Sequence, residues 1–259
     1  MIRILIVAFL LASMARAEEA VELKWTLAKG DRFGIEVALE AASEIRDPDG
    51  KYETTRTIKL SAVMEVLETG EDGSKVEIRI LRTSGKSRVV DGEIEDTPLD
   101  SEARDWTPLS ATLSKRGELE IDIQGFMQQP EILIADCLMG LFPPLPDRAV
   151  KAKDTWPGLD TKNEEKIQLA AVARKSGKVE ATITGSASSE AKVPTADGQK
   201  AEVQTTKSTS SAVFDATDGS LRSVALQMSA ERREETKHKP SQTQSLRRTV
   251  TVTRIKPGK

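Results

Sequence analysis

Apolar and polar residues alternate along most of the chain after residue 30. The first clear run places Phe33, Ile35 and Val37 at every second position. A period of two puts the apolar side chains on one face of a β-strand and the polar ones on the other. The pattern therefore predicts a sheet with one buried and one wet face. The same alternation returns around residues 58–66, 76–80, 119–123, 167–171, 179–183, 224–228 and 246–255.

Short turn sequences separate these runs. Asp47-Pro48-Asp49-Gly50 and Asp218-Gly219 are strong hairpin signals, because proline presets φ and glycine accepts a positive φ. There is no alternation of strands with long helices and no glycine-rich phosphate loop, which disfavours a nucleotide-binding fold. We predict a mainly β fold, in which an antiparallel meander forms a large curved sheet or an open half-barrel.

One segment departs from the strand pattern. Between about residues 126 and 142 apolar residues recur at helical spacing, with Pro130 placed for a first turn and Gly140 for the end. We expect this helix to pack on the sheet. The chain then divides into an N-terminal β half (18–125), a helix and proline-rich connector (126–156) and a C-terminal β half (157–259). We expect one continuous domain, although the sequence leaves two domains open.

The first seventeen residues have the order of a secretory signal peptide. Arg3 precedes an apolar run over residues 4–12, and Ala15-Arg16-Ala17 fits the cleavage pattern, which predicts cleavage between Ala17 and Glu18. The alternative is a buried N-terminal strand or helix. Because no cysteine follows the run, we expect a secreted or periplasmic protein that is not a lipoprotein. No stretch of the chain is long and apolar enough to predict a spanning helix.

Composition excludes several kinds of site. The chain has one His and one Cys, a net charge of −3 and 3% aromatic residues, so a cysteine zinc site, a disulfide framework and nucleic-acid binding by bulk charge are all excluded. His238 lies between two lysines in a polar turn, and Cys137 lies in an apolar run that favours an inert, packed thiol. We expect no catalytic residue, no cofactor and no enzymatic activity.

The acidic stretch 91–105 contains a candidate calcium site. Asp91, Glu93, Glu95 and Glu102 fall at positions 1, 3, 5 and 12 of a calcium-loop pattern. Asp96 stands where that pattern requires glycine, and no helix precedes the stretch. The alternative is a solvated acidic loop.

The C-terminal segment has the opposite charge. This charge could dock an envelope protein or an anionic surface. The alternative is that two strands display charges on their wet face, where they also block edge pairing. Residues 231–259 hold three acidic side chains and nine basic ones: Arg232, Arg233, Lys237, Lys239, Arg247, Arg248, Arg254, Lys256 and Lys259.

The connector carries a family resemblance. Leu145-Pro146, then Val150, then Asp154 and Trp156 resemble a motif of exported bacterial β proteins of unknown function. The resemblance implies export and an antiparallel β fold but no activity. Lys153 stands where the motif has glycine. The plan of a curved sheet with a helix against its hollow face is also similar to periplasmic lipoprotein-carrier proteins.

Three functions follow from these observations. The first is an exported, non-enzymatic protein that binds an apolar small molecule, a lipid or an envelope partner in the concave face of its sheet. The second is a structural or interaction module of the cell envelope without a cavity. The third is a hydrolase that uses two facing carboxylates, which the scarcity of aromatic residues disfavours for a carbohydrate substrate.

Overall fold

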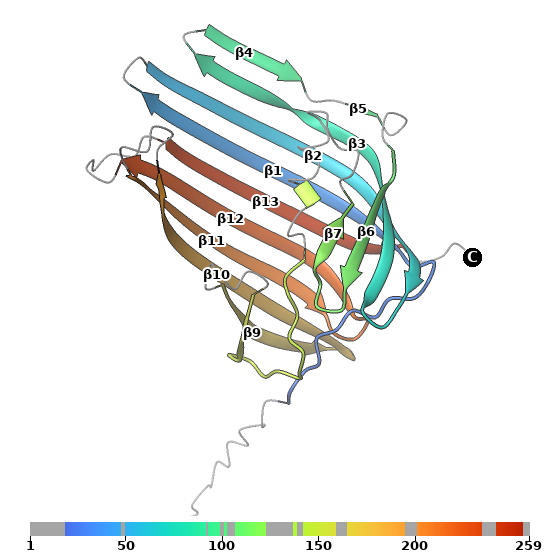
Figure 1. Cartoon of the computed structure of the whole chain (residues 1–259). Coiled ribbons are helices and arrows are strands. Elements are labelled where there is room, and N and C mark those ends of the chain that lie inside the picture. The colour runs from blue at the N-terminus through green and yellow to red at the C-terminus, as the bar shows by residue number, and fades with distance from the viewer. Residues whose placement is uncertain are drawn as a thin grey trace, which may run out of the picture.

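The fold is a single antiparallel sheet. The computed structural model describes residues 19–47, 50–91, 93–98, 101–102, 107–122, 137–138, 142–158, 165–194, 201–234 and 242–255. These residues form one 13-stranded sheet, which confirms the predicted mainly β fold (Figure 1). The strands are β1 (Arg32–Asp47), β2 (Gly50–Thr69), β3 (Gly73–Asp91), β4 (Glu93–Pro98), β5 (Ser101–Glu102), β6 (Leu109–Ser114), β7 (Leu119–Ile121), β8 (Thr155–Pro157), β9 (Lys166–Lys175), β10 (Lys178–Pro194), β11 (Ala201–Asp215), β12 (Ser220–Glu234) and β13 (Gln242–Ile255).

Two meanders join side by side in this sheet. The strand order is β7-β6-β3-β2-β1-β13-β12-β11-β10-β9-β8, with β4 and β5 paired to β3. The join is the pairing of β1 with β13, which runs in register from Arg32 opposite Ile255 to Ile45 opposite Gln242. The sheet is therefore continuous across the N-terminal and C-terminal halves.

Bulges bend the long strands. Leu67 and Leu81 are skipped in the pairing of β2 with β3, and Arg222 is skipped in the pairing of β11 with β12. An extra residue on one strand increases local twist and bends the strand. Leu67 and Leu81 each directly follow a buried residue, Val66 and Ile80, so alternation places both on the outer face, where they are exposed.

The core lies on one face of the sheet, here called the inner face. It is the face that carries Phe33, Ile35 and Val37 of β1, all nearly inaccessible to solvent. Every second residue of β2 from Ile58 to Val66 is buried on the same side. The opposite, outer face is mostly polar. The period of two thus produces the one-sided burial that the sequence predicts.

Several segments cover the inner face at one end of the long strands. Figure 1 shows β6, β7 and the stretch 142–158 in front of the sheet there, and their apolar side chains belong to the same core cluster. Val21 pairs its backbone with Val150, at N···O distances of 2.7 and 2.9 Å. Trp25 packs edge-on against Phe142 and Phe214. The covered half of the inner face is thus a solid core.

The predicted helix lies mostly outside the described residues. Cys137 and Leu138 are helical and fully buried, and the main-chain oxygen of Cys137 accepts a 3.4 Å hydrogen bond from Arg248 Nη1 of β13. The described part of this segment therefore lies against the inner face, as predicted. The signal peptide with Ala17 and Glu18, and also His238, lie outside the described residues. In the described part of the chain, no helix is both long and apolar enough to cross a membrane.

Candidate functional site

The motif residues of the connector form a structural support. Leu145 and Trp156 are buried, and Trp156 Nε1 donates a 2.8 Å hydrogen bond to the carbonyl of Pro144. Pro146 is buried beside them. Asp154 Oδ2 accepts a hydrogen bond from the N–H of Lys151 at 3.0 Å, which closes a turn. The polar groups of Trp156 and Asp154 are hydrogen-bonded to the connector backbone, and the apolar side chains are buried. These residues therefore hold the connector on the core.

Lys153 adopts the backbone conformation that the motif's glycine would favour. Its φ is 74°, in the left-handed region that residues with a Cβ rarely enter. Lys153 therefore holds a turn conformation that a glycine would adopt without strain. The N–H of Lys153 donates to the carbonyl of Leu169 at 2.6 Å, and this bond ties the turn to β9.

The four calcium candidates lie on strands rather than in a loop. In backbone register Asp91 faces Glu93, and Glu95 faces Val89. Glu102 instead faces Arg82, nine residues from Asp91 on β3, which corresponds to about 30 Å along the strand. The structure therefore does not bring the four backbones together. Their side chains are not described, and the described residues contain no group of three or more metal-ligating side chains.

Three of the C-terminal arginines make internal contacts. Arg232 pairs with Glu202, and Arg254 pairs with Asp31 while its guanidinium lies 5.6 Å from the ring centre of Phe33. Arg248 is 3% exposed. Much of the positive charge in the described part of this segment therefore acts within the fold. Arg233 and Arg247 lie on the outer face.

A buried ionic turn joins β11 to β12. Asp215 Oδ1 accepts hydrogen bonds from the N–H groups of Thr217 and Asp218 at 3.0 and 3.2 Å. The bulge at Arg222 aims its guanidinium at Asp215 and Asp218, with N···O distances of 2.7 and 2.6 Å. Burial alone raises the pKa of Asp215, but the Arg222 guanidinium and the two N–H groups outweigh it and hold this pKa below its ordinary value.

Asp215 is expected to contribute to acid sensitivity. A carboxyl with a lowered folded pKa stabilises the fold above its unfolded pKa of about 4, and this contribution is lost as the pH falls through the folded value. Asp215→Asn should lower the free energy of unfolding by about 1–3 kcal/mol at pH 7 and flatten its fall below pH 4. Urea unfolding between pH 7 and 2 measures both effects. The exposed Glu71→Gln serves as control, and identical pH profiles for wild type and Asp215→Asn would contradict the expectation.

The inner face changes character beyond Arg248. Up to that level it is apolar and covered. In the next row Ala41, Leu246 and Met228 are directly paired across β1, β13 and β12. All three are only half-buried. We call these three residues the apolar strip. Ala41 and Leu246 pack against the edge of the apolar core cluster.

Polar side chains follow the apolar strip toward the far end of the same strands. Gln244 faces Ala230, and in the last row Arg232 lies between Gln242 and Gln204. A hollow of about 270 Å³ opens over these residues and is lined by Gln204, Ala230, Glu231, Arg232, Gln242 and Gln244. Five of these six belong to the inner face by strand alternation. We call this hollow the amide hollow.

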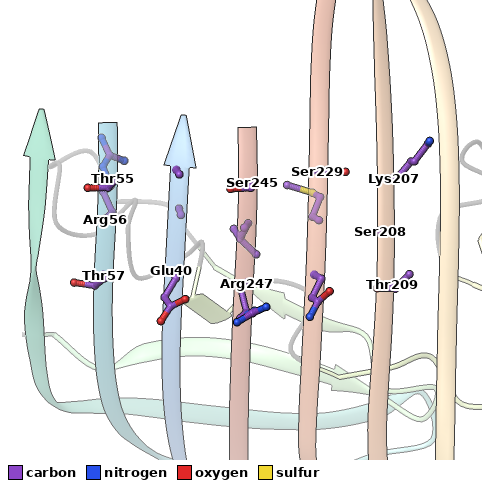
Figure 2. Close-up of a pocket in the computed structure, with 15 residues that line it drawn as sticks. Glu40, Thr55, Arg56, Thr57, Lys207, Ser208, Thr209, Ser229, Ser245 and Arg247 are labelled. Carbon is purple, nitrogen blue, oxygen red and sulfur yellow. The ribbon is translucent and has the colours of Figure 1, made fainter. Parts of the chain in front are cut away.

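A second hollow, of about 570 Å³, lies on the outer face (Figure 2). Its lining takes three consecutive residues from each of five strands, and Ala41, Met228 and Leu246 of the apolar strip are the middle residues of three of these triplets. The inner-face neighbours Leu39, Ser43 and Leu226 do not line it. The space therefore lies between two rows of outer-face side chains, mostly hydroxyl, amide or charged. The first row is Thr57, Glu40, Arg247, Gln227 and Thr209, and the second is Thr55, Ala42, Ser245, Ser229 and Lys207.

Sequence reasoning missed both hollows and the apolar strip. Alternation already assigned Leu246 and Met228 to the buried face. Alternation carries no information on which residues of distant strands face each other, so the rows of facing side chains could not be predicted. The available signal was strand length: β1, β2 and β10 to β13 are each 14 to 20 residues long, more than their covered halves require.

Comparison with known proteins gives a likeness in fold. No family model matches the chain, and no curated protein matches it. Among solved structures, one described as lipid–protein interactions in lipovitellin matches with a TM-score of 0.58 at 10% identity, covering 90% of this chain and 26% of that one. The chain thus spans about a quarter of that lipovitellin chain. At this identity the match shows the fold alone.

Two further solved structures match more weakly. An outer membrane channel from Pseudomonas putida F1 has a TM-score of 0.21 at 8% identity, covering 88% of this chain and 97% of that one. A DUF1329 family protein from Desulfovibrio piger has a TM-score of 0.15 at 9% identity, covering 90% and 88%. Neither likeness is close enough to support an argument. The motif resemblance therefore stays a prediction.

Proposed function

We propose that the protein is an exported, non-enzymatic binding protein that holds an apolar or amphipathic small molecule on the inner face of its sheet. The observation that carries the proposal is the apolar strip, which continues the core face and stays only half-buried. Apolar side chains left half-buried at the centre of a sheet gain free energy when a ligand removes them from water. The signal-peptide pattern and the motif resemblance support export.

The position of the strip favours a small ligand over self-association. Ala41, Leu246 and Met228 lie at the middle of the sheet, between polar Arg56 on β2 and Ser208 on β11. An apolar patch framed by polar groups is typical of a ligand site. The outer hollow is larger, and its walls are two rows of mostly hydroxyl, amide or charged side chains. The likeness in fold to the lipovitellin structure, which is described as showing lipid–protein interactions, agrees with a lipid as the ligand.

Binding rather than catalysis is supported by the state of the reactive groups. Cys137 is fully buried, and burial disfavours its thiolate. Asp215 is engaged by Arg222 and by two N–H groups in a turn far from the strip. Within the described residues, the apolar strip presents alkyl groups framed by the Arg56 guanidinium and the Ser208 hydroxyl, an arrangement suited to binding and orienting a ligand.

Titration with the neutral apolar fluorophore N-phenyl-1-naphthylamine tests the proposal. Met228 and Leu246 face each other on β12 and β13, so we expect the double variant Met228→Gln/Leu246→Gln to weaken dye binding at least about tenfold, since two apolar contacts are lost. The matched control is Ser229→Gln/Ser245→Gln, the adjacent facing pair on the outer face, which should change affinity less than about twofold.

Circular dichroism and urea unfolding show whether both double variants fold. Equal weakening in the two would place the dye elsewhere and contradict the proposal. A wild-type protein that binds no dye would also contradict it. The positions are half-buried or exposed, so large losses of stability are not expected in either variant.

A further inference from the structure

We infer that the amide hollow is the headgroup site for an amphiphile whose headgroup is uncharged and rich in hydroxyls, such as a glycerol or sugar ester. This inference rests on the proposed function, because the ligand's tail would lie on the apolar strip. The two regions are continuous on one face. From Leu246 to Gln242 is four residues along β13, about 13 Å, which a single acyl ester can span.

The amide hollow offers both hydrogen-bond donors and hydrogen-bond acceptors. Gln204, Gln242 and Gln244 each carry an amide with two N–H donors and a carbonyl acceptor. A hydroxyl group likewise donates and accepts. Carboxamides on β11 and β13, the two strands that flank β12, therefore match several neighbouring hydroxyls at once. Because all three glutamines are half-buried or exposed, the amides meet water when the hollow is empty and can exchange it for a ligand.

The positive charge of Arg232 in the amide hollow is already paired within the fold. Arg232 is ion-paired with Glu202, the residue two positions before Gln204 on β11, and the Glu202 side chain is 17% exposed. An anionic headgroup would have to compete with Glu202 for the guanidinium, and Glu231 at the rim adds negative charge. A cationic headgroup would face Arg232. Both kinds of charged headgroup are therefore disfavoured relative to a neutral one.

Two ligands with the same acyl chain isolate the headgroup. We expect wild type at pH 7.5 to bind 1-monolauroylglycerol about tenfold more tightly than laurate, both measured by displacement of the bound fluorophore. Replacing two amides in Gln204→Leu/Gln242→Leu should weaken monolauroylglycerol binding about tenfold and leave fluorophore binding unchanged. The matched control is Thr205→Leu/Thr243→Leu, whose residues both face Glu231 and lie on the outer face; it should change neither.

Glu202→Gln provides the sharper test. It removes the carboxylate that neutralises Arg232, so laurate affinity should rise at least about tenfold and the preference for monolauroylglycerol should be lost. If the fluorophore binds at the strip but the two ligands bind equally in wild type, or Glu202→Gln leaves the preference unchanged, the headgroup inference is overturned while the proposed function stands. If wild type binds no fluorophore, the proposed function fails and the inference fails with it.

Discussion

Phe214→Ala is expected to lower the free energy of unfolding by about 3–5 kcal/mol. Phe214 is fully buried on β11, and its ring meets Trp25 edge-on with 5.6 Å between centroids. Trp25 in turn meets Phe142 at 5.0 Å. The side chain therefore joins the sheet to the N-terminal segment and the connector. Its removal leaves a cavity bordered by three separate parts of the chain, which cannot all collapse into it.

Urea unfolding followed by circular dichroism measures this effect. Val213→Ala is the matched control, because Val213 is the preceding residue, is only half-buried and faces the other side of the sheet. It should cost about 1 kcal/mol. Similar losses in both variants would show that the cluster of Trp25, Phe142 and Phe214 does not join the covering segments to the sheet.

Gly219→Ala is expected to lower the free energy of unfolding by about 2–4 kcal/mol. Gly219 ends the β11–β12 turn with a φ of 63°, where a Cβ is strained. Its carbonyl accepts a 3.0 Å hydrogen bond from the N–H of Thr26. A Cβ added there would lie 2.7 Å from the Thr26 backbone nitrogen, so the N-terminal segment would have to move.

Gly177→Ala separates the two causes. Gly177 also has a positive φ, 78°, in the turn between β9 and β10, but a Cβ there would meet nothing within 4 Å. Gly177→Ala should lower the free energy of unfolding by about 1 kcal/mol, because backbone strain is its one expected effect. Thermal unfolding of the two variants gives the comparison. If Gly177→Ala costs as much as Gly219→Ala, the contact of the turn with Thr26 does not contribute to stability.

Local sequence signals predicted much of the fold. Alternation identified parts of β1, β2, β3, β7, β9, β10, β12 and β13, but not the other strands. The hairpins predicted at Asp47-Pro48-Asp49-Gly50 and Asp218-Gly219 are confirmed by the structure. The apolar setting of Cys137 predicted its burial. These features depend on neighbours in sequence, because strand periodicity and turn conformation are local properties of the backbone.

The candidate site was much less predictable. A glutamine at residue 242 and another at 204 give no sign in sequence that they flank Arg232, since β11, β12 and β13 meet only through long-range register. No pattern in the sequence indicated the bulge that turns Arg222 toward Asp215. Pairing of separated strands depends on the total burial of both faces rather than on any local pattern.

The sequence by itself determined which residues form strands, which face of each strand is apolar and where the hairpins turn. Only the tertiary structure decided that β1 pairs with β13, so that the first and last long strands lie at the centre of one sheet. The same pairing sets Ala41 beside Leu246 and builds the apolar strip. The physical reason is that alternation selects a face for every side chain, whereas its neighbours across the sheet are selected by packing and hydrogen bonding between strands that lie about 200 residues apart in the chain.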